Sequence, residues 1–258
     1  MQQFKLGLNF NHVTPLLWFA DYVDLSQLPS PPSGGFDWAD KVTVPLGMLD
    51  NDRLGDCEIA RVMHTIMVLK AMGGHAVPAF TNADADIVYG EVNGTTPGGP
   101  GWDQGTDMVV SSAFWKKTGY RDAQNVHHKV DDYLAVQVGD AATIAKIVST
   151  FGPVGLGIMV GQTQEDQFSN NEVWNFQAGD KPDGGHAVPV TGVDASGNLC
   201  FITWGGKAKM TPKFYARHCQ QAVACLSYDA LAASGFNPAN INQAQLQADW
   251  QIIQRDAA

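Results

Sequence analysis

Residues 49–72 have the sequence LDNDRLGDCEIARVMHTIMVLKAM, and this stretch decides the fold. The apolar side chains after Glu58 recur at the spacing of a well-buried helix: Ile59, Val62, Met63, Ile66, Met67 and Leu69. We expect this helix to begin at or just before Cys57, which follows a turn containing Gly55. Free N–H groups and aligned dipoles at a helix N-terminus stabilise a thiolate, so Cys57 is placed as a nucleophile would be. The alternative is a small buried apolar residue, which is the commoner fate of a free cysteine.

The remainder of the chain changes from helical to strand-rich patterns. Helical spacing recurs over residues 107–119, 140–151 and 240–255. Short apolar runs separated by turn residues predict strands over residues 153–160, 186–194 and 198–206. Helices first and strands afterwards predict an α+β fold with segregated elements.

Composition limits the classes of partner. The 258 residues are 45% apolar, which is enough for one large domain or two closely packed lobes. A net charge of -10 without a Lys/Arg cluster disfavours nucleic acid. The first residues lack the pattern of a signal peptide, and no run is long and apolar enough to span a bilayer. We therefore expect a cytoplasmic protein with neither a nucleic-acid nor a membrane partner.

The four cysteines are Cys57, Cys200, Cys219 and Cys225. Without an export signal, free thiols are favoured over disulfides, and the last two are expected in the core of a helix. No set of three or four ligands can be assembled around His64 for a metal. The Gly-rich run of residues 93–106 is not followed by the Gly-Lys-Ser/Thr of a phosphate loop. Neither a metal nor a cofactor is predicted.

His186 is the candidate partner of Cys57. It opens an apolar strand after a glycine pair, in the sequence DGGHAVPVTGVD of residues 183–194. An imidazole at the mouth of a strand can face a cleft and accept a proton from a thiol. A solvated histidine at a strand end is the alternative.

Taken together, these segments resemble the papain family of cysteine peptidases in the order of their motifs. Phe36 to Lys41 (FDWADK) resembles the family's mature N-terminal segment, and Gly55-Asp56-Cys57 resembles its nucleophile turn. Gly152-Pro153-Val154 resembles the strand that leads into the second lobe. His186-Ala187-Val188, together with Gly192, resembles the histidine strand, and Trp204-Gly205 resembles the end of an Asn-Ser-Trp-Gly element. The separation of 186 − 57 = 129 residues between Cys57 and His186 is also similar to the family's. The resemblance covers residues 36 to 215.

The resemblance implies a two-lobed papain-like fold with the active site between the lobes. The expected catalytic domain is 36–230, with a helical lobe over 36–130 and a β-rich, barrel-like lobe over 131–230. An N-terminal arm (1–35) precedes it and a C-terminal helical extension (231–258) follows it. The arm is expected across the cleft or along its side. It is short for the family's inhibitory propeptide, so no conventional zymogen step is expected.

Carried over from the family, Cys57 would be the nucleophile and His186 its base, with the Cys57 N–H as half of an oxyanion hole. Asn51 stands six residues before Cys57 where the family has Gln, and offers the same amide on a shorter arm. Gly105 and Thr106 match a Gly pair that binds substrate backbone. The alternative for these two residues is a flexible surface loop.

The chain departs from the family pattern beside the site. Ile202 stands where the family has the Asn that orients the histidine, and Ile cannot accept an N–H bond. The ring must then be held by the Thr203 hydroxyl or a backbone carbonyl, or be held less firmly, with Trp204 as a shield, which predicts a Cys-His dyad. Leu54 replaces the family's disulfide cysteine, in accord with a reducing compartment. Glu58 replaces an aromatic residue, and the sequence offers no explanation for it.

The sequence therefore predicts a cysteine-type peptidase that hydrolyses peptide or isopeptide bonds in peptide or protein substrates through an acyl-thioester. One alternative is a cell-wall amidase that uses the same dyad. Another is a catalytically inactive papain-fold protein that binds peptides, motivated by Ile202 and Glu58.

Overall fold

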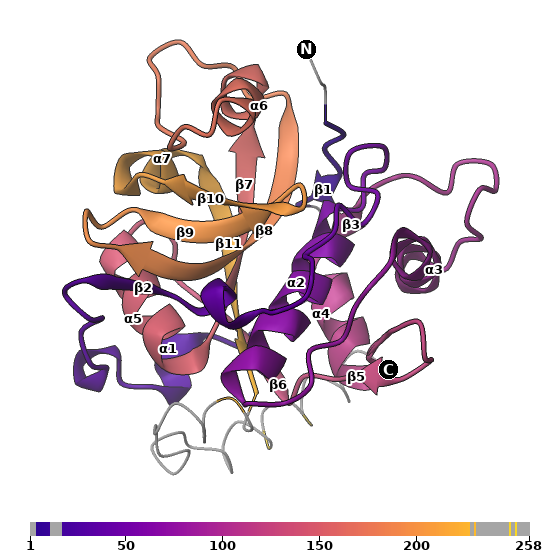
Figure 1. Cartoon of the computed structure of the whole chain (residues 1–258), viewed down its shortest axis with the longest axis horizontal. Helices are drawn as coiled ribbons and strands as arrows, with labels where there is room; N and C mark the ends of the chain where they lie inside the picture. Colours follow the sequence, from indigo (N-terminus) through magenta and orange to yellow (C-terminus); the bar gives the residue numbers. More distant parts are fainter. Residues whose placement is uncertain (1–3, 11–16, 228–229, 231–247, 249–250, 252–258) are drawn as a thin grey trace.

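The computed structural model describes residues 4–10, 17–227, 230, 248 and 251. A seven-stranded antiparallel sheet occupies one side of the molecule and a group of helices the other (Figure 1). The strand order is β10-β9-β8-β7-β11-β6, and β2 pairs with β8. The strands of this sheet are β2 (Gly35–Asp37), β6 (Asp132–Ala135), β7 (Val154–Val160), β8 (Gly184–Asp194), β9 (Leu199–Thr203), β10 (Gly206–Met210) and β11 (Cys219–Leu226). The remaining strands form two short pairs: β1 (Leu8–Asn9) with β3 (Thr106–Asp107), and β4 (Tyr120–Arg121) with β5 (His127–His128).

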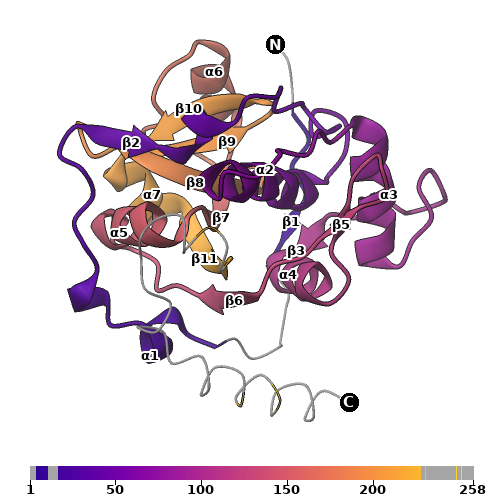
Figure 2. The same ribbon diagram turned by 60° about the horizontal axis from the view of Figure 1, so that its bottom comes forward.

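The helices divide between two lobes. The helical lobe contains α2 (Cys57–Met72), α3 (Asn82–Asn93) and α4 (Met108–Lys117). The sheet lobe carries α5 (Ala141–Phe151), α6 (Gln162–Ser169) and α7 (Pro212–His218), and the N-terminal part of the chain adds α1 (Phe19–Tyr22), η1 (Leu25–Gln27) and η2 (Trp38–Lys41). The α+β fold predicted from the sequence is confirmed: the large sheet lies on one side of the molecule with α5, α6 and α7 around it, and α2, α3 and α4 lie on the other side (Figures 1 and 2). The sheet is open, because within the described residues no pairing joins β6 to β10 into the barrel that the sequence predicted.

Helix α2 is the centre of the molecule. It begins at Cys57, as predicted, and all of its residues except Lys70 and Ala71 are buried. It lies between β8 on one side and α3 and α4 on the other (Figure 2). A helix packed on every side needs no polar face, which explains why residues 57–72 contain so few charged side chains.

The helices predicted from residues 107–119 and 140–151 are confirmed, and each begins at an aspartate. The Asp107 carboxylate accepts from the Val109 and Val110 backbone N–H groups at the start of α4. Asp140 does the same for Ala142 and Thr143 at the start of α5. These bonds satisfy N–H groups that have no partner inside a helix.

Two local expectations differ from the structure. Residues 219 to 226 form strand β11 between β7 and β6, not a helix around Cys219 and Cys225. Residues 222–226 are buried without interruption, and such a run has no period that separates a central strand from a helix, which accounts for the error. Helix α3, which runs to Asn93, was not predicted, although Thr81 and Asp84 form a capping box at its start. The helix predicted over residues 240–255 lies almost entirely outside the described residues.

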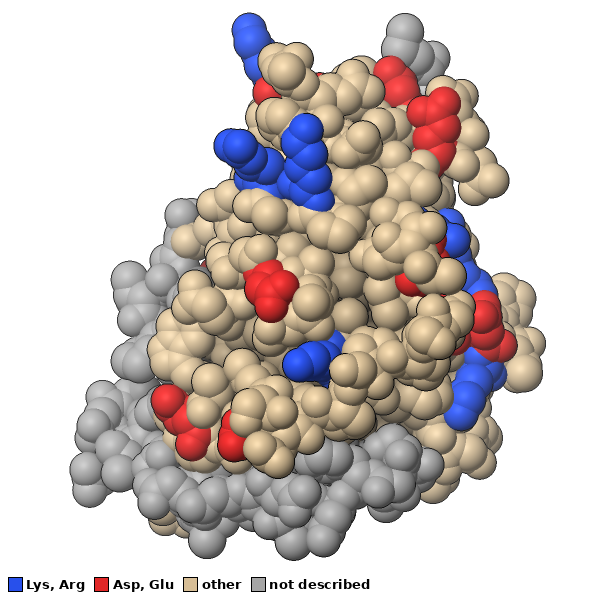
Figure 3. All heavy atoms as spheres, turned by 90° about the vertical axis from the view of Figure 1, so that its left-hand side faces the viewer, with Lys and Arg blue, Asp and Glu red and all other residues tan. Residues whose placement is uncertain are grey.

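All four cysteines are buried free thiols. No helix in the described part of the chain combines the length and apolar character needed to cross a bilayer. On the face seen from the left-hand side of Figure 1, Lys and Arg side chains are interspersed with Asp and Glu (Figure 3). This face therefore presents charges of both signs without a large basic field.

Candidate active site

The sulfur of Cys57 is the meeting point of three segments. Cys57 is the first residue of α2 and its exposed fraction is 0%. Backbone groups of Ala187 in β8 and of Gly7, just before β1, hydrogen-bond to the sulfur and stabilise its thiolate, as N–H donors do. Helix α2, strand β8 and the residues around Gly7 thus converge on one atom.

The imidazole of His186 adjoins this point because His186 directly precedes Ala187 in β8. Its exposed fraction is 1%. Its Nε2 lies 2.8 Å from the Thr203 hydroxyl oxygen. Its Nδ1 has no hydrogen-bond partner among the described residues. The ring therefore has one nitrogen held and the other available.

Thr203 and Trp204 surround the ring. The Trp204 indole stacks on the His186 imidazole with ring centroids 4.8 Å apart and an interplanar angle of 24°. Successive side chains of a strand point to opposite faces, so Thr203 reaches the ring while its neighbour Ile202 lies buried elsewhere. Although Ile202 offers no hydrogen-bond acceptor, the imidazole thus has a hydroxyl partner one residue further along the chain.

Burial sets the protonation of both groups in this structure. It raises the pKa of the Cys57 thiol to about 12, against the opposing effect of the bonds from Ala187 and Gly7. It lowers the pKa of His186 to about 3. At neutral pH the thiol and the imidazole are consequently both uncharged, and no thiolate-imidazolium pair is present in this covered state.

Asn51 lies at the site but its amide is engaged. The Asn51 Nδ2 donates to a carboxyl oxygen of Asp56 over 3.2 Å. Burial raises the pKa of Asp56 well above its usual range, and the bond from Asn51 opposes this rise. The amide that we expected to face an oxyanion therefore contacts the residue before Cys57, and its second N–H has no partner among the described residues. Sequence reasoning did not single out Asp56.

The structure explains Glu58, the second residue of α2. The Glu58 carboxylate accepts a hydrogen bond from the Arg61 Nε over 2.8 Å and a second one from Nη2 of the same guanidinium. Both side chains are fully buried. Burial raises the pKa of Glu58, and Arg61 acts against this rise. Glu58 thus has a charged partner inside the core.

Thr106, which we expected to bind substrate backbone, pairs with an extended segment of the chain itself, whereas Gly105 packs against Gly7 of that segment and its backbone bonds to Tyr89 and Asn93. Strand β1 pairs in parallel with β3, so that Leu8 lies opposite Thr106 (Figure 1). The Thr106 N–H donates to the Gly7 carbonyl over 2.9 Å. Residues 4 to 10, which we call the N-terminal segment, belong to the predicted N-terminal arm. They lie against β3 and the Cys57 sulfur.

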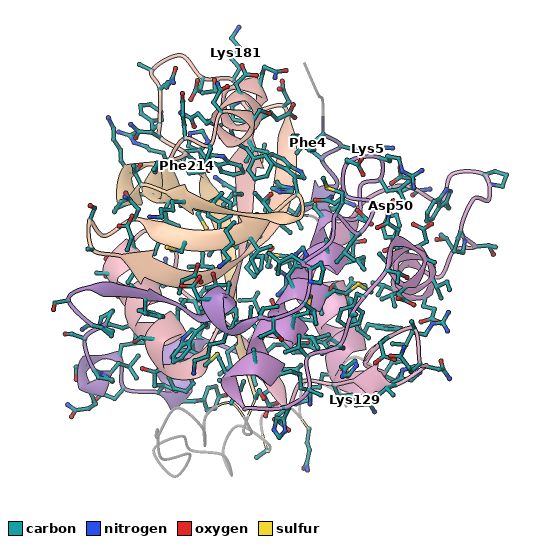
Figure 4. All side chains as sticks on the ribbon, in the orientation of Figure 1. Phe4, Lys5, Asp50, Lys129, Lys181 and Phe214 are labelled. Atoms are coloured by element: carbon teal, nitrogen blue, oxygen red, sulfur yellow. The ribbon has the colours of Figure 1, made fainter. Side chains whose placement is uncertain are left out.

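Two side chains hold the start of the N-terminal segment. The Phe4 ring stacks on Trp204 with centroids 4.1 Å apart and an interplanar angle of 11°. Lys5 forms an ion pair with Asp103, which also accepts from the Gly55 N–H and the Tyr89 hydroxyl. Figure 4 shows Phe4 and Lys5 at the upper end of the molecule, where the chain enters between the lobes.

Sequence reasoning missed the residues of this segment, although a signal was present. Phe4, Leu6, Leu8 and Phe10 alternate with other residues, which is the pattern of a half-buried strand. The pattern does not show which surface would bury that strand, because the contacts join residues about 50 to 200 positions apart along the chain.

The fold has known counterparts among solved structures. Xylellain, a cysteine protease from Xylella fastidiosa, matches with a TM-score of 0.63 and 14% identity over 88% of this chain and 97% of its own. A cysteine protease of Carica candamarcensis in complex with E-64 matches with a TM-score of 0.56 and 13% identity over 75% and 98%. Digestive procathepsin L 3 of Tenebrio molitor matches with a TM-score of 0.57 and 16% identity over 83% and 75%.

The fold is papain-like. The identities are low, so this likeness concerns the fold and not the activity. No protein-family model matches the sequence, and no curated protein does.

Proposed function

We propose that the protein is a cysteine peptidase, with Cys57 as nucleophile and His186 as general base. One observation carries the proposal: the Cys57 sulfur lies at the start of a buried helix and is hydrogen-bonded to the backbone of Ala187. The residue before Ala187 is His186, and the His186 ring is held by Thr203. A cysteine at a helix N-terminus beside an oriented imidazole is the arrangement that activates a thiol. The papain-like fold makes peptide or protein substrates the expected class.

The reaction proceeds through an acyl-enzyme. In the open cleft, His186 takes the thiol proton, and the Cys57 sulfur bonds to the substrate carbonyl carbon. The carbon–nitrogen bond then breaks, the amine leaves with the proton from the imidazolium, and a thioester remains. Water, deprotonated by His186, then attacks the thioester carbon. The carbon–sulfur bond breaks, the carboxylic acid leaves, and the imidazolium returns its proton to the Cys57 thiolate. The Cys57 N–H and the free N–H of Asn51 stabilise the oxyanion in both halves.

Thr203 serves as the orienting residue in this mechanism. With Nε2 held by the Thr203 hydroxyl, Nδ1 is the nitrogen left to exchange a proton with sulfur. A hydroxyl can accept from the imidazolium, so the bond survives both protonation states of the ring. The catalytic unit is a dyad with a hydroxyl support.

The test is hydrolysis of fluorescently labelled casein by the wild type and by Gly7→Ala, a change that uncovers Cys57 because a side chain at residue 7 collides with Gly55. Cys57→Ala and His186→Ala in the Gly7→Ala background are the controls. We expect hydrolysis by Gly7→Ala that both controls abolish. A folded Gly7→Ala protein that leaves casein and short peptides intact would overturn the proposal.

The same assay separates the two alternatives. Release of soluble fragments from purified cell walls, with casein untouched, would assign the dyad to an amidase. Saturable peptide binding without hydrolysis would assign the fold to a binding protein. The second outcome has one observation in its favour, since the cleft already holds a peptide segment.

A further inference from the structure

We propose that Glu165 makes the protein select substrates with a lysine or arginine shortly after the bond to be cleaved, on the side of the leaving amine. Glu165 lines a cavity of about 450 Å³ at one end of the candidate active site. The inference rests on the proposed function, because it names the class of substrate for the proposed cleavage. It is argued from the charges of this cavity and from its position relative to His186.

The cavity lies between the two lobes. Apart from the N-terminal segment, its walls come from the loop before α2, from α6 and from the residue before β8: Asp52, Arg53, Gln162, Glu165 and Asp183. Phe4, Lys5 and Leu6 complete the walls, and Figure 4 shows Phe4 and Lys5 at this end of the molecule. A substrate that took the place of these three residues would lay its own side chains against the same walls.

Negative charge exceeds positive charge in this cavity. Three carboxylates line it, those of Asp52, Glu165 and Asp183. The two cations that line it have partners outside it, since Arg53 pairs with Asp50 and Lys5 pairs with Asp103. A cationic side chain is therefore the group that would complement these walls.

Glu165 is the carboxylate with the most to gain from such a partner. Its exposed fraction is 4%. The Phe4 backbone hydrogen-bonds to the carboxylate, but Oε2 has no partner among the described residues. Burial raises the pKa of Glu165, and the charges of Asp183 and Asp166 raise it as well. An ammonium or guanidinium group would supply the missing donor and offset the like charges.

The distance from the nucleophile indicates which substrate residues could enter. Leu6 lines the cavity, and the next residue, Gly7, bonds to the Cys57 sulfur through its backbone. An extended chain rises about 3.3 Å per residue, so the cavity walls lie within about three residues of the bond to be cleaved.

The neighbours of α6 indicate the direction. Phe168, one turn after Glu165 in α6, contacts Trp204 edge-on with ring centroids 5.1 Å apart, and Trp204 stacks on His186. In the proposed mechanism the leaving amine takes its proton from the His186 imidazolium, so the amine must lie on this side of the sulfur. The part of the substrate that follows the cleaved bond therefore runs toward Glu165.

The opposite end of the cleft, beyond Gly7, has a different character. A cavity of about 370 Å³ there is lined by the amide side chains of Asn9, Asn93 and Gln104, among others. The carboxylate of Asp107, which also lines it, accepts from two backbone N–H groups at the start of α4. Selection for a basic side chain is thus expected on the leaving-amine side alone.

The test maps the bonds that the Gly7→Ala protein cleaves in casein, using mass spectrometry of the fragments. We expect Lys and Arg to be enriched within about three residues after the cleaved bonds. Glu165→Gln keeps the shape and removes the charge, so it should lower kcat/KM at these bonds at least about tenfold, as for one hydrogen bond to a charged group. Glu165→Lys should exclude the same bonds.

Two other variants bracket the effect. Asp183→Asn keeps an oxygen for the Gln162 N–H, which Asp183 accepts over 3.2 Å, and should weaken the preference in the same direction. Glu172→Gln is the matched control, because it removes an exposed carboxylate just after α6 that does not line the cavity. It should cleave as its Gly7→Ala parent does. Circular dichroism verifies that every variant is folded.

A binding measurement makes the result independent of hydrolysis. In the Gly7→Ala background, Cys57→Ala cannot form a thioester, and fluorescence anisotropy measures its affinity for pools of labelled hexapeptides. The pools have Lys, Gln or Glu at the fifth position and mixed residues elsewhere. We expect the Lys pool to bind at least about tenfold more tightly than the Glu pool, and Glu165→Gln to remove most of this difference.

The outcomes separate this inference from the proposed function. Equal results for Lys, Gln and Glu in both assays would overturn the selection, and so would a preference that Glu165→Gln leaves unchanged. A Lys preference in binding that Glu165→Gln removes would support it, even if casein stayed intact. That last combination would reject the peptidase alone.

Discussion

Replacing Arg61 with methionine tests the buried ion pair next to the nucleophile. Arg61 and Glu58 are both fully buried, and the substitution removes the guanidinium that contacts both carboxylate oxygens. Removing one partner of a buried pair leaves the other charge uncompensated, which costs about 3 to 5 kcal/mol of unfolding free energy. Hydrogen bonds to charged groups are worth about 1.5 to 3 kcal/mol each, so the loss of two gives a similar sum.

The loss should depend on pH in a defined direction. Burial already raises the pKa of Glu58, and without Arg61 to oppose it the pKa rises further. A carboxyl with a raised pKa binds its proton more tightly in the folded state, so stability declines as pH rises above the unfolded value of about 4.3. Arg61→Met should therefore be destabilised less, relative to wild type, at pH 4.5 than at pH 7.5.

Urea unfolding followed by circular dichroism at both pH values measures the two differences. The control is the double variant Glu58→Gln with Arg61→Met, which has no carboxylate and should lose this dependence on pH. A destabilisation below about 1 kcal/mol, well under the value for a broken buried pair, would refute the reasoning. So would a loss of equal size at both pH values.

Three other predictions concern the site and the fold. Thr203→Val in the Gly7→Ala background should lower casein hydrolysis about tenfold, equivalent to about 1.4 kcal/mol, because His186 Nε2 loses its partner. Thr203→Ser should retain the rate. Equal rates for Thr203→Val and its Gly7→Ala parent would remove Thr203 from the mechanism. Asp140→Ala should lower the urea-derived stability by about 1 kcal/mol and Asp140→Asn by less, since the caps of Ala142 and Thr143 depend on its oxygens; no difference between the two would contradict this. Gly152→Ala should destabilise the protein by at least about 1 kcal/mol in the same assay, because residue 152 has φ of 93° and the new methyl would lie 2.9 Å from Leu69; a neutral effect would count against it.

Local signals account for the parts of the fold that could be predicted. The helix from Cys57 and the helices capped by Asp107 and Asp140 have apolar spacing and start signals within a few residues of one another. Strand β11 could not be recognised, because its residues 222–226 are buried on both faces and have no alternation to separate them from a helix. The open sheet, in place of a barrel, follows from β6 and β10 remaining unpaired edges within the described residues, and pairing between strands so far apart in sequence leaves no local signal.

The candidate site divides in the same way. The positions of Cys57 and His186 follow from the turn and strand that carry them, but sequence alone left the support of the imidazole open between Thr203 and a carbonyl. Only the orientation of Thr203 in its strand places its hydroxyl oxygen 2.8 Å from the His186 Nε2. The contact of Gly7 with Cys57 is a tertiary event between distant residues, and no local pattern encodes it.

The covalent connection between the N-terminal segment and the cleft has a quantitative consequence. A short tether gives a ligand an effective concentration of the order of 1 mM, so a segment whose free peptide binds with a Kd of only about 10 µM would be bound about 99% of the time. Dilution does not change this ratio, because the encounter is intramolecular. A competitor that shares the cleft would need to exceed its own Kd by about a hundredfold before it occupied half the molecules. Scarce peptides would leave the protein closed, and concentrated ones would open it.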